Sequence, residues 1–131
     1  MKHHLCGVVG LFAFALAMAP IAAMAQSGAQ YATPLNSSCI SQFWDSAMYN
    51  WMSYQNNCGE PVHLMWYART KGGGFSDDIR AGGKSNTGFS RFEVNDMGGF
   101  TLFVCPKGYL PVDSSGLQVH DANASYRCKK M

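Results

Sequence analysis

Four of the five cysteines carry the chemistry that is easiest to interpret in this sequence: Cys39, Cys58, Cys105 and Cys128. They form no C-x-x-C pair and have no histidine at ligand spacing, so their pattern indicates no metal site. An even number of cysteines in a small chain with an export signal is typical of two disulfides. We expect the nested pairing, Cys58 with Cys105 and Cys39 with Cys128, because the inner pair flanks the strand-rich middle. The sequential pairing, Cys39 with Cys58 and Cys105 with Cys128, remains open.

Nucleophilic catalysis would require a serine or cysteine served by a histidine and a carboxylate. Beyond the N-terminal segment the chain has only His63 and His120, and it has no G-x-S-x-G motif. A serine beside His120 and either Asp113 or Asp121 would complete such a set, but a histidine in a polar loop is more often simply solvated. Oxidised cysteines offer no thiol. The sequence therefore predicts no catalytic residue of this kind.

Glycoside hydrolysis would instead need two carboxylates across a cleft. The adjacent Asp77 and Asp78 follow the glycine run at residues 72–74, where a polar hairpin tip is the simpler interpretation. A chain of this size offers little room for a cleft that excludes water. We therefore expect a protein that is not an enzyme and needs no cofactor, with a small secreted hydrolase as the alternative.

Aromatic side chains are dense between residues 43 and 67 and suggest a binding surface. A small core needs bulky residues, so burial explains most of them. Exposed tryptophan and tyrosine beside asparagine can also stack on sugar rings or anchor a protein partner. His63, Met65 and Tyr67 alternate along one expected strand. Their shared face is the candidate for an exposed binding face, while the large apolar groups on it indicate the alternative that both faces of the strand are partly covered. The predicted binding face comprises Trp44, Trp51, His63, Trp66 and Tyr67.

The N-terminus has the order of a cleavable signal peptide. Residues 1–4 are a short cationic stretch, residues 5–18 are apolar, and Ala-Met-Ala at residues 23–25 matches an A-x-A cleavage site. The apolar run breaks before Pro20 and is shorter than the roughly 20 residues of a membrane span, so we expect no transmembrane anchor in the mature chain. We predict cleavage near Ala25 and a protein that is secreted or periplasmic.

Cleavage would leave about 100 residues, enough for one domain and too few for two cores. We expect residues 1–25 to be the signal peptide, residues 26–38 a flexible leader, and residues 39–131 the disulfide-stapled domain. The chain carries 10 Lys and Arg against 8 Asp and Glu, and only Lys2 leaves with the signal, so the mature chain is close to neutral. Such a charge does not indicate nucleic acid as a partner.

Alternating apolar residues bounded by turn signals predict short strands along most of the domain. The expected strands cover residues 49–55, 62–69, 88–94, 100–105, 109–112 and 125–129. Residues 40–48 have the spacing of a short helix, as the positions of Ile40, Phe43 and Ala47 show. Glycine-rich turns without a long amphipathic helix favour an all-β fold. We expect a small antiparallel β-sandwich or barrel-like domain with two disulfides and at most one short helix.

Three short motifs resemble small exported bacterial β domains of unassigned activity. Residues 57–62, Asn-Cys-Gly-Glu-Pro-Val, are similar to their Asn-Cys-x-x-Pro-Val strand start. Residues 81–85 are similar to a glycine-rich turn in mid-chain, and residues 104–109 to a Cys-Pro segment that ends a later strand. The resemblance covers residues 49–112. It implies a fold type and a location in the cell envelope, and it supplies no site residue.

Together these observations predict a non-catalytic binding or envelope-associated module. Its expected partner is a glycan or an envelope protein, and a carbohydrate-binding domain that uses exposed aromatics is a specific form of this hypothesis. A binding module requires exposed aromatic side chains on one surface, whereas a hydrolase requires a histidine beside a carboxylate in a cleft.

Overall fold

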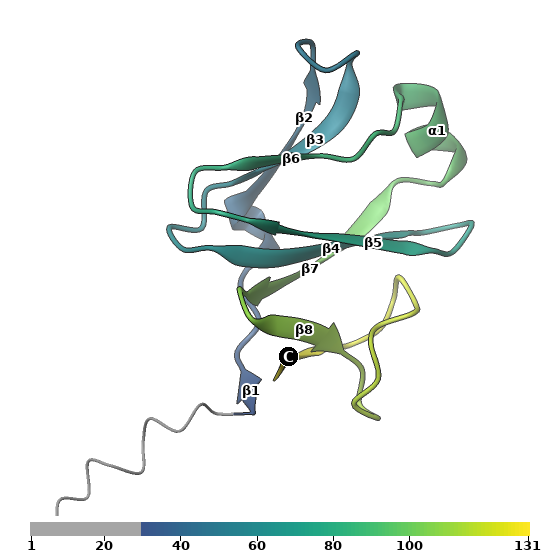
Figure 1. Ribbon diagram of the computed structural model, residues 1–131. Helices are drawn as coiled ribbons and strands as arrows, with labels where there is room; N and C mark the ends of the chain where they lie inside the picture. The colour runs from purple at the N-terminus through teal and green to yellow at the C-terminus, as the bar shows by residue number, and fades with distance from the viewer. Residues whose placement is uncertain (1–29) are drawn as a thin grey trace, which may run out of the picture.

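The computed structural model describes residues 30–131, so the predicted signal peptide at residues 1–25 and the start of the predicted leader lie outside the described residues. The described chain forms three antiparallel sheets of three strands each, one α-helix and one 3-10 helix (Figure 1). This confirms the predicted all-β fold with two disulfides and one short α-helix. Neither helix of residues 30–131 has the length and apolar character that crossing a membrane would require.

Each sheet has one central strand. In the first sheet, β3 (Trp51–Asn56) lies between β2 (Ile40–Asp45) and β6 (Lys84–Asn86). In the second sheet, β4 (Val62–Ala68) lies between β5 (Gly74–Ile79) and β7 (Phe100–Pro106). In the third sheet, β9 (Arg127–Lys130) lies between β1 (Tyr31–Ala32) and β8 (Tyr109–Val112). The 3-10 helix η2 (Ser37–Cys39) precedes β2, and α1 (Arg91–Asp96) precedes β7. Figure 1 shows the second sheet in the middle, with the β2–β3 hairpin projecting above it and β8 below.

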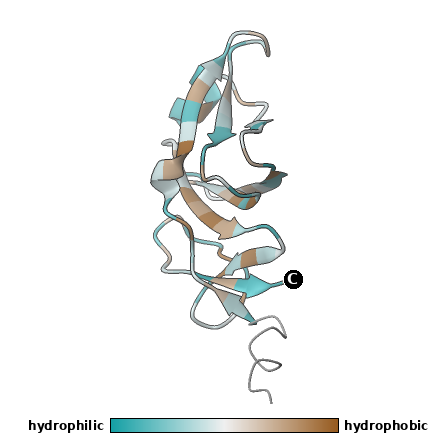
Figure 2. Cartoon of the chain, turned by 90° about the vertical axis from the view of Figure 1, so that its left-hand side faces the viewer, coloured by the Kyte–Doolittle hydropathy of each residue, from teal (hydrophilic) through white to brown (hydrophobic). Residues whose placement is uncertain are grey.

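β4 is the centre of the fold because both of its faces are buried. Val62, Leu64 and Trp66 point toward the first sheet and pack with Met52 and Tyr54 of β3 in the main core. The alternation of apolar residues predicts this strand, and the structure confirms it. Hydrophobic positions follow the strands through the middle of the molecule (Figure 2).

The opposite face of β4 is covered by the C-terminal segment. Met65 packs with Phe103 of β7 and with Val119 in a second, smaller core. Of the two interpretations of this face, exposure is wrong and coverage of both faces of the strand is confirmed, since Met65 is buried, His63 is only 8% exposed and Tyr67 is half-buried. The covering side chains come from a loop without a regular strand, so no sequence period marks them.

Residues 40–45 form strand β2 instead of the predicted short helix. β2 pairs with β3 along its whole length, from Ile40 opposite Asn56 to Asp45 opposite Trp51. A helix this short is marginal in water, whereas the strand gains a complete hydrogen-bonded ladder with its neighbour. Tertiary pairing therefore overrides the helical spacing of the sequence.

Residues 91–96 form α1, where the sequence predicts a strand over residues 88–94. Ser90 is the N-cap: its hydroxyl accepts a hydrogen bond from Glu93 N, and the Glu93 carboxylate accepts one from Ser90 N. This capping box stabilises the first helical turn, and its Ser-x-x-Glu pattern is a start signal for a helix. Val94 is the residue that the helix buries in the main core.

The predicted leader is part of the fold from residue 31 onward. Tyr31 and Ala32 form β1, which pairs with Lys129 and Cys128 of β9. The Arg127 guanidinium lies 4.4 Å from the centroid of the Tyr31 ring. The expectation of a flexible leader up to residue 38 is therefore corrected, because edge pairing with the last strand fixes this segment.

The disulfides are sequential, Cys39–Cys58 and Cys105–Cys128, so the nested prediction is wrong. Cys39 precedes β2 and Cys58 follows β3, and the register that places Ile40 opposite Asn56 brings both cysteines to the open end of this hairpin. The second disulfide joins β7 to β9 and holds the third sheet against the second. Strand pairing, which the spacing of cysteines does not reveal, determines the connectivity.

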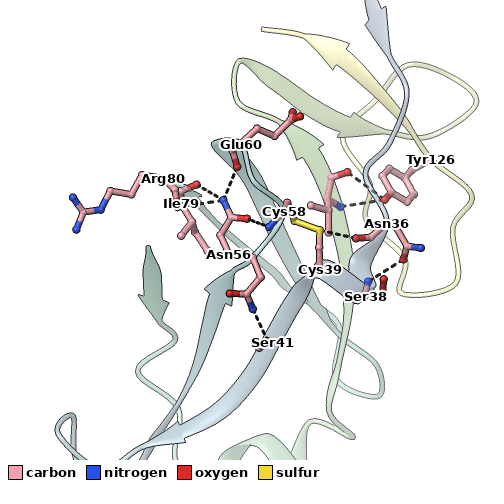
Figure 3. The surroundings of a disulfide bond; sticks show 12 residues. Asn36, Ser38, Cys39, Ser41, Asn56, Cys58, Glu60, Ile79, Arg80 and Tyr126 are labelled. Carbon is pink, nitrogen blue, oxygen red and sulfur yellow. Dashed lines mark hydrogen bonds between the residues drawn. A yellow bond between two sulfur atoms is a disulfide. The ribbon is translucent and has the colours of Figure 1, made fainter. Parts of the chain in front are cut away.

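Asn56 is fully buried and connects three backbone segments beside the first disulfide (Figure 3). Its side-chain amide donates to the carbonyl oxygens of Glu60, Ile79 and Arg80 at 2.7, 3.0 and 3.2 Å. Its side-chain oxygen accepts a hydrogen bond from Cys58 N at 2.8 Å. The amide is therefore fully paired, and it ties the end of β3 to the turn before β4 and to the end of β5.

Candidate binding face

The first sheet presents one face to the core and one away from it. Because side chains alternate along a strand, the burial of Met52 and Tyr54 in the core places Trp51, Ser53 and Gln55 on the opposite face. The pairing of β3 with β2 and β6 adds their neighbours to that face. We call this side of the sheet the outer face; it comprises Ser41, Phe43 and Asp45 of β2, Trp51, Ser53 and Gln55 of β3, and Lys84 and Asn86 of β6. Asp45 and Ser53 are buried within it, so the accessible part of the outer face consists of the other six residues.

Tyr49 extends the outer face at the tip of the β2–β3 hairpin. Trp51 N donates to Met48 O at 2.9 Å and closes the turn, while Tyr49 and Asn50 have φ angles of 55° and 56°. Positive φ at both central residues is characteristic of a type I′ turn, which usually carries Asn and Gly. The left-handed conformation costs a tyrosine roughly 1–2 kcal/mol. Strain of this kind concentrates at functional sites.

The aromatic rings of this surface face solvent in part. Tyr49 is 79% exposed, and its ring centroid lies 5.2 Å from that of Trp51. Trp51 and Phe43 are half-buried. Contiguous exposed apolar surface on a small domain is a sign of a binding site. The Tyr49–Trp51 pair therefore marks the hairpin tip as the point where a ligand would first make contact.

Amides and hydroxyls lie beside these rings. Asn86 donates to Ser53 Oγ at 2.9 Å across the β3–β6 pair. The side chain of Gln55 has no hydrogen-bond partner within residues 30–131. An unpaired amide offers two donors and one acceptor to a ligand. The outer face therefore places an unpaired amide beside aromatic rings that are partly exposed.

The two charged groups of the outer face neutralise each other. Lys84 Nζ lies 2.5 Å from Asp45 Oδ2 and 6.0 Å from the centroid of the Phe43 ring. Asp45 is 6% exposed, and the hydrogen bond from Lys84 holds the pKa of its carboxyl below the usual 3.8. The outer face consequently presents no net charge to a ligand.

Replacing Lys84 with Gln is expected to lower the free energy of unfolding at neutral pH and to change little in acid. Because the folded state depresses the pKa of Asp45, the ion pair stabilises the fold above the usual value of 3.8, and this contribution is lost as the pH falls through the lower folded value. Urea unfolding of the wild type and K84Q across the acid range measures the difference. The two stability curves should separate above about pH 4 and converge below it.

Lys71→Gln is the matched control for this measurement. Lys71 pairs with Asp96, but the two side chains are 58% and 51% exposed. Exposed ion pairs contribute little to stability. An equal, equally pH-dependent loss in K71Q would show that the effect does not belong to the Asp45 pair.

The five predicted binding residues do not form one surface. Trp51 alone lies on the outer face. Trp44 lies on the other side of the first sheet, where the Arg91 guanidinium is 4.6 Å from its ring centroid. Trp66 is buried in the main core, and His63 and Tyr67 lie on the far face of β4. The predicted face is therefore corrected, because its residues come from three different surfaces.

His63 and Asp78 form a hydrogen-bonded pair across β4 and β5, with 2.7 Å between Nδ1 and Oδ1. In a catalytic triad the acid is buried and the other imidazole nitrogen meets the nucleophile. In this pair the acid is the more exposed group, in contrast to a triad: the side chain of Asp78 is 45% exposed and that of His63 is 10% exposed. His63 Nε2 is buried and has no hydrogen-bond partner within residues 30–131. The nitrogen that would serve a nucleophile is therefore shielded from substrate.

His120 also lies near a carboxylate, but the three groups are in a different order from a triad. Asp113 is in the middle: its Oδ2 is 3.7 Å from His120 Nδ1, and its Oδ1 accepts a hydrogen bond from Ser115 Oγ at 2.6 Å. A triad places the imidazole between the hydroxyl and the acid so that it can remove the proton. In this arrangement the carboxylate, and not the imidazole, accepts the hydrogen bond of the Ser115 hydroxyl.

Asp77 and Asp78 lie inside β5 and not at the predicted hairpin tip. Alternation along the strand points them to opposite faces of the second sheet. Asp77 accepts a hydrogen bond from Ser85 Oγ at 2.6 Å, whereas Asp78 meets His63. Two carboxylates on opposite faces of a sheet cannot act together on one glycosidic bond.

Family models, curated proteins and solved structures give no match to this chain. Among residues 30–131, no group of three or more His, Cys, Asp and Glu side chains is placed to hold a metal ion. The outer face is the arrangement that offers a ligand both stacking and hydrogen bonding.

Sequence reasoning identified Trp51 and missed the polar half of the outer face, Gln55, Lys84 and Asn86. A period of two was present in residues 41–45, but the same residues also fit a helical spacing. β6 reaches the outer face through a pairing with β3 that is distant in sequence. No local sequence pattern predicts a pairing between strands this far apart in the chain. The contribution of β6 to the outer face is therefore visible only in the folded structure.

Proposed function

We propose that this chain is a non-catalytic binding domain that holds a neutral glycan on its outer face. The observation that carries the proposal is the exposed ring of Tyr49, which is held in a strained turn and packs against Trp51. A conformation that costs stability and exposes an aromatic ring is explained when that ring has a ligand.

Aromatic rings and sugars are complementary in shape and in charge distribution. The electron-rich face of an aromatic ring attracts C–H groups, and a pyranose ring presents several of them on one side. The hydroxyls at the edge of the sugar need donors and acceptors, which the unpaired amide of Gln55 would supply. The outer face combines both kinds of group over neighbouring strands.

Charge favours a neutral glycan over an acidic one. Asp45 and Lys84 pair with each other, so neither is available to attract an ionic ligand. An anionic polysaccharide would gain little from an ammonium group that already has a counter-ion. An envelope protein is the second candidate for the same aromatic rings, and the test below distinguishes the two.

Export is part of the proposal. Two disulfides are consistent with an oxidising location. The cationic, apolar and small-residue order of the N-terminus supports a secreted or periplasmic protein that is cleaved near Ala25. N-terminal sequencing of the protein recovered from periplasm and culture medium should begin close to Gln26, and recovery of the uncut chain would contradict export by this route.

Replacing Tyr49 with Asn separates binding from stability. Asn adopts a positive φ more readily than Tyr, so Y49N is expected to raise the free energy of unfolding by up to about 1 kcal/mol. The same change removes the exposed ring and should weaken glycan binding at least about tenfold. Urea unfolding measures stability. An array of neutral and acidic oligosaccharides identifies the ligand, and calorimetry with the best oligosaccharide measures affinity.

Phe92→Ala is the matched control for Tyr49→Asn. Phe92 is 80% exposed on α1 and does not belong to the outer face. F92A should bind the oligosaccharide like the wild type, and equal weakening in both variants would indicate unspecific adhesion. An array without any bound glycan, or a preference for acidic ones, would contradict the neutral-glycan proposal. Binding to an envelope protein that Y49N abolishes would establish the second candidate instead.

A further inference from the structure

We infer that the third sheet carries a second site, a pocket for a short-chain amphiphile with an anionic head group. The pocket lies between the β8–β9 pair and the loop that follows β8, and its volume is about 290 Å³. Leu110, Val112, Leu117 and Met131 supply apolar lining, and Lys129 and Lys130 line the same pocket. None of these residues belongs to the outer face, so the inference does not depend on the proposed function.

The register of β8 and β9 sets the floor of the pocket. Leu110 lies opposite Lys129, and Val112 lies opposite Arg127. Alternation places these side chains on one face of the sheet and Cys128 on the other, where the disulfide joins it to β7. The pocket therefore opens on the face of the third sheet that points away from the second sheet.

The loop after β8 folds back over this floor and is closed by its own hydrogen bonds. Asp113 N donates to Leu117 O at 2.8 Å, and Gln118 forms a β-bridge with Val112. The Asp113 carboxylate accepts hydrogen bonds from the hydroxyl and N–H of Ser115, and the hydroxyl is the main cause that lowers the pKa of Asp113. The loop thus holds Leu117 at the pocket although its side chain is largely exposed.

The fold leaves the ammonium groups of this pocket without counter-ions. The ion pairs within residues 30–131 involve neither Lys129 nor Lys130. The Asp113 carboxylate of the adjacent loop is occupied by Ser115 and lies beside His120. Along β9, Lys129 shares the face of Leu110, whereas Lys130 shares the face of Cys128. A negatively charged group in the pocket would therefore find the unpaired ammonium of Lys129 next to an apolar wall.

Apolar lining and unpaired cations together select an amphiphile. A purely apolar ligand would leave Lys129 without a counter-ion, and a simple anion would leave Leu110 and Leu117 in water. Ligand pockets measure about 300–1,000 Å³, so a volume of about 290 Å³ suits a short alkyl chain. An alkyl carboxylate such as octanoate has both required parts.

Titration of the oxidised, isotope-labelled protein with octanoate tests the site. We expect saturable NMR shifts at Leu110, Leu117 and Lys129. Octanoate should bind at least about fivefold more tightly than octanol, which lacks the charge. It should also bind more tightly than acetate, which lacks the chain, and octylamine should not bind. Equal affinity for octanol would overturn the anionic part of the proposal, and equal affinity for acetate would overturn the apolar part.

Two variants and one control complete the test. Leu117 is 65% exposed, so Leu117→Ser should leave the fold intact and weaken octanoate binding about tenfold. Lys129→Gln should weaken octanoate about fivefold and leave octanol unchanged. Lys107→Gln, in the exposed turn between β7 and β8, should bind like the wild type. Unchanged octanoate affinity in K129Q, or no shift at Leu110 and Leu117 at millimolar octanoate, would overturn the assignment of the pocket.

Discussion

Replacing Asn56 with Asp is expected to lower the free energy of unfolding at neutral pH by about 3–5 kcal/mol, although the two side chains have the same shape. The amide of Asn56 is fully buried and donates to three carbonyl oxygens. A carboxylate would present a negative oxygen to those three acceptors and could donate to none of them. Urea unfolding of the oxidised protein measures the loss.

The pH dependence of N56D identifies the cause of this loss. Burial against carbonyl groups would raise the pKa of the introduced carboxyl in the folded state, so N56D should regain stability as the pH falls and the acid becomes protonated. Asn57→Asp is the matched control, because Asn57 is exposed and its amide donates to Ser41 Oγ at 2.7 Å. N57D should change the stability by less than about 0.5 kcal/mol. A pH-independent loss in N56D would contradict the hydrogen-bond account.

Removing the Cys105–Cys128 disulfide by the double change to Ala is expected to lower the free energy of unfolding by about 3–5 kcal/mol. The bond closes a loop with a sequence separation of 23, and loop closure alone accounts for about 3 kcal/mol of that loss. Both sulfur-bearing residues are fully buried, so the change also leaves a small cavity between β7 and β9. Urea unfolding and hydrogen exchange of β8 and β9 measure the effect.

The Cys39–Cys58 pair provides the comparison for this prediction. Its sequence separation of 19 gives a similar entropic contribution, but both cysteines are half-buried and lie at the end of a hairpin that β2 and β3 already pair. We expect a smaller loss and no selective exposure of the third sheet. Increased exchange confined to β8 and β9 in the Cys105–Cys128 variant supports its role as the tie between sheets. A loss below about 1 kcal/mol would contradict that role.

The two proposed binding surfaces differ in how they relate to stability. Tyr49 sits in a conformation that destabilises its turn, so the outer face is formed at a cost to the fold. The loop that carries Leu117 is instead stabilised by hydrogen bonds from within the loop to Asp113. Changing Tyr49 should therefore improve stability while impairing binding, whereas changing Leu117 should leave stability nearly unchanged.

Local chemistry in the sequence determined most of the strands and the class of the fold. The nearly continuous apolar run along residues 62–68 specifies β4, because a strand with two buried faces needs apolar side chains on both sides. Pro106 and the glycine runs determine where strands end, because proline fixes its φ angle and glycine adopts φ angles that other residues avoid. The even number of cysteines predicted two disulfides, and both are present.

Only the tertiary structure decided how these strands combine. Residues 40–45 fit a helix or a strand by spacing, and the ladder with β3 selected the strand. The cysteine partners, the burial of His63 and the neighbours of Trp51 all depend on which strands lie side by side. The free energy of strand pairing comes from contacts between residues that are far apart in the chain, and a local sequence pattern does not contain information about those contacts. For that reason the sequence indicates that aromatic rings are dense in this region, while the fold determines which of those rings are exposed together.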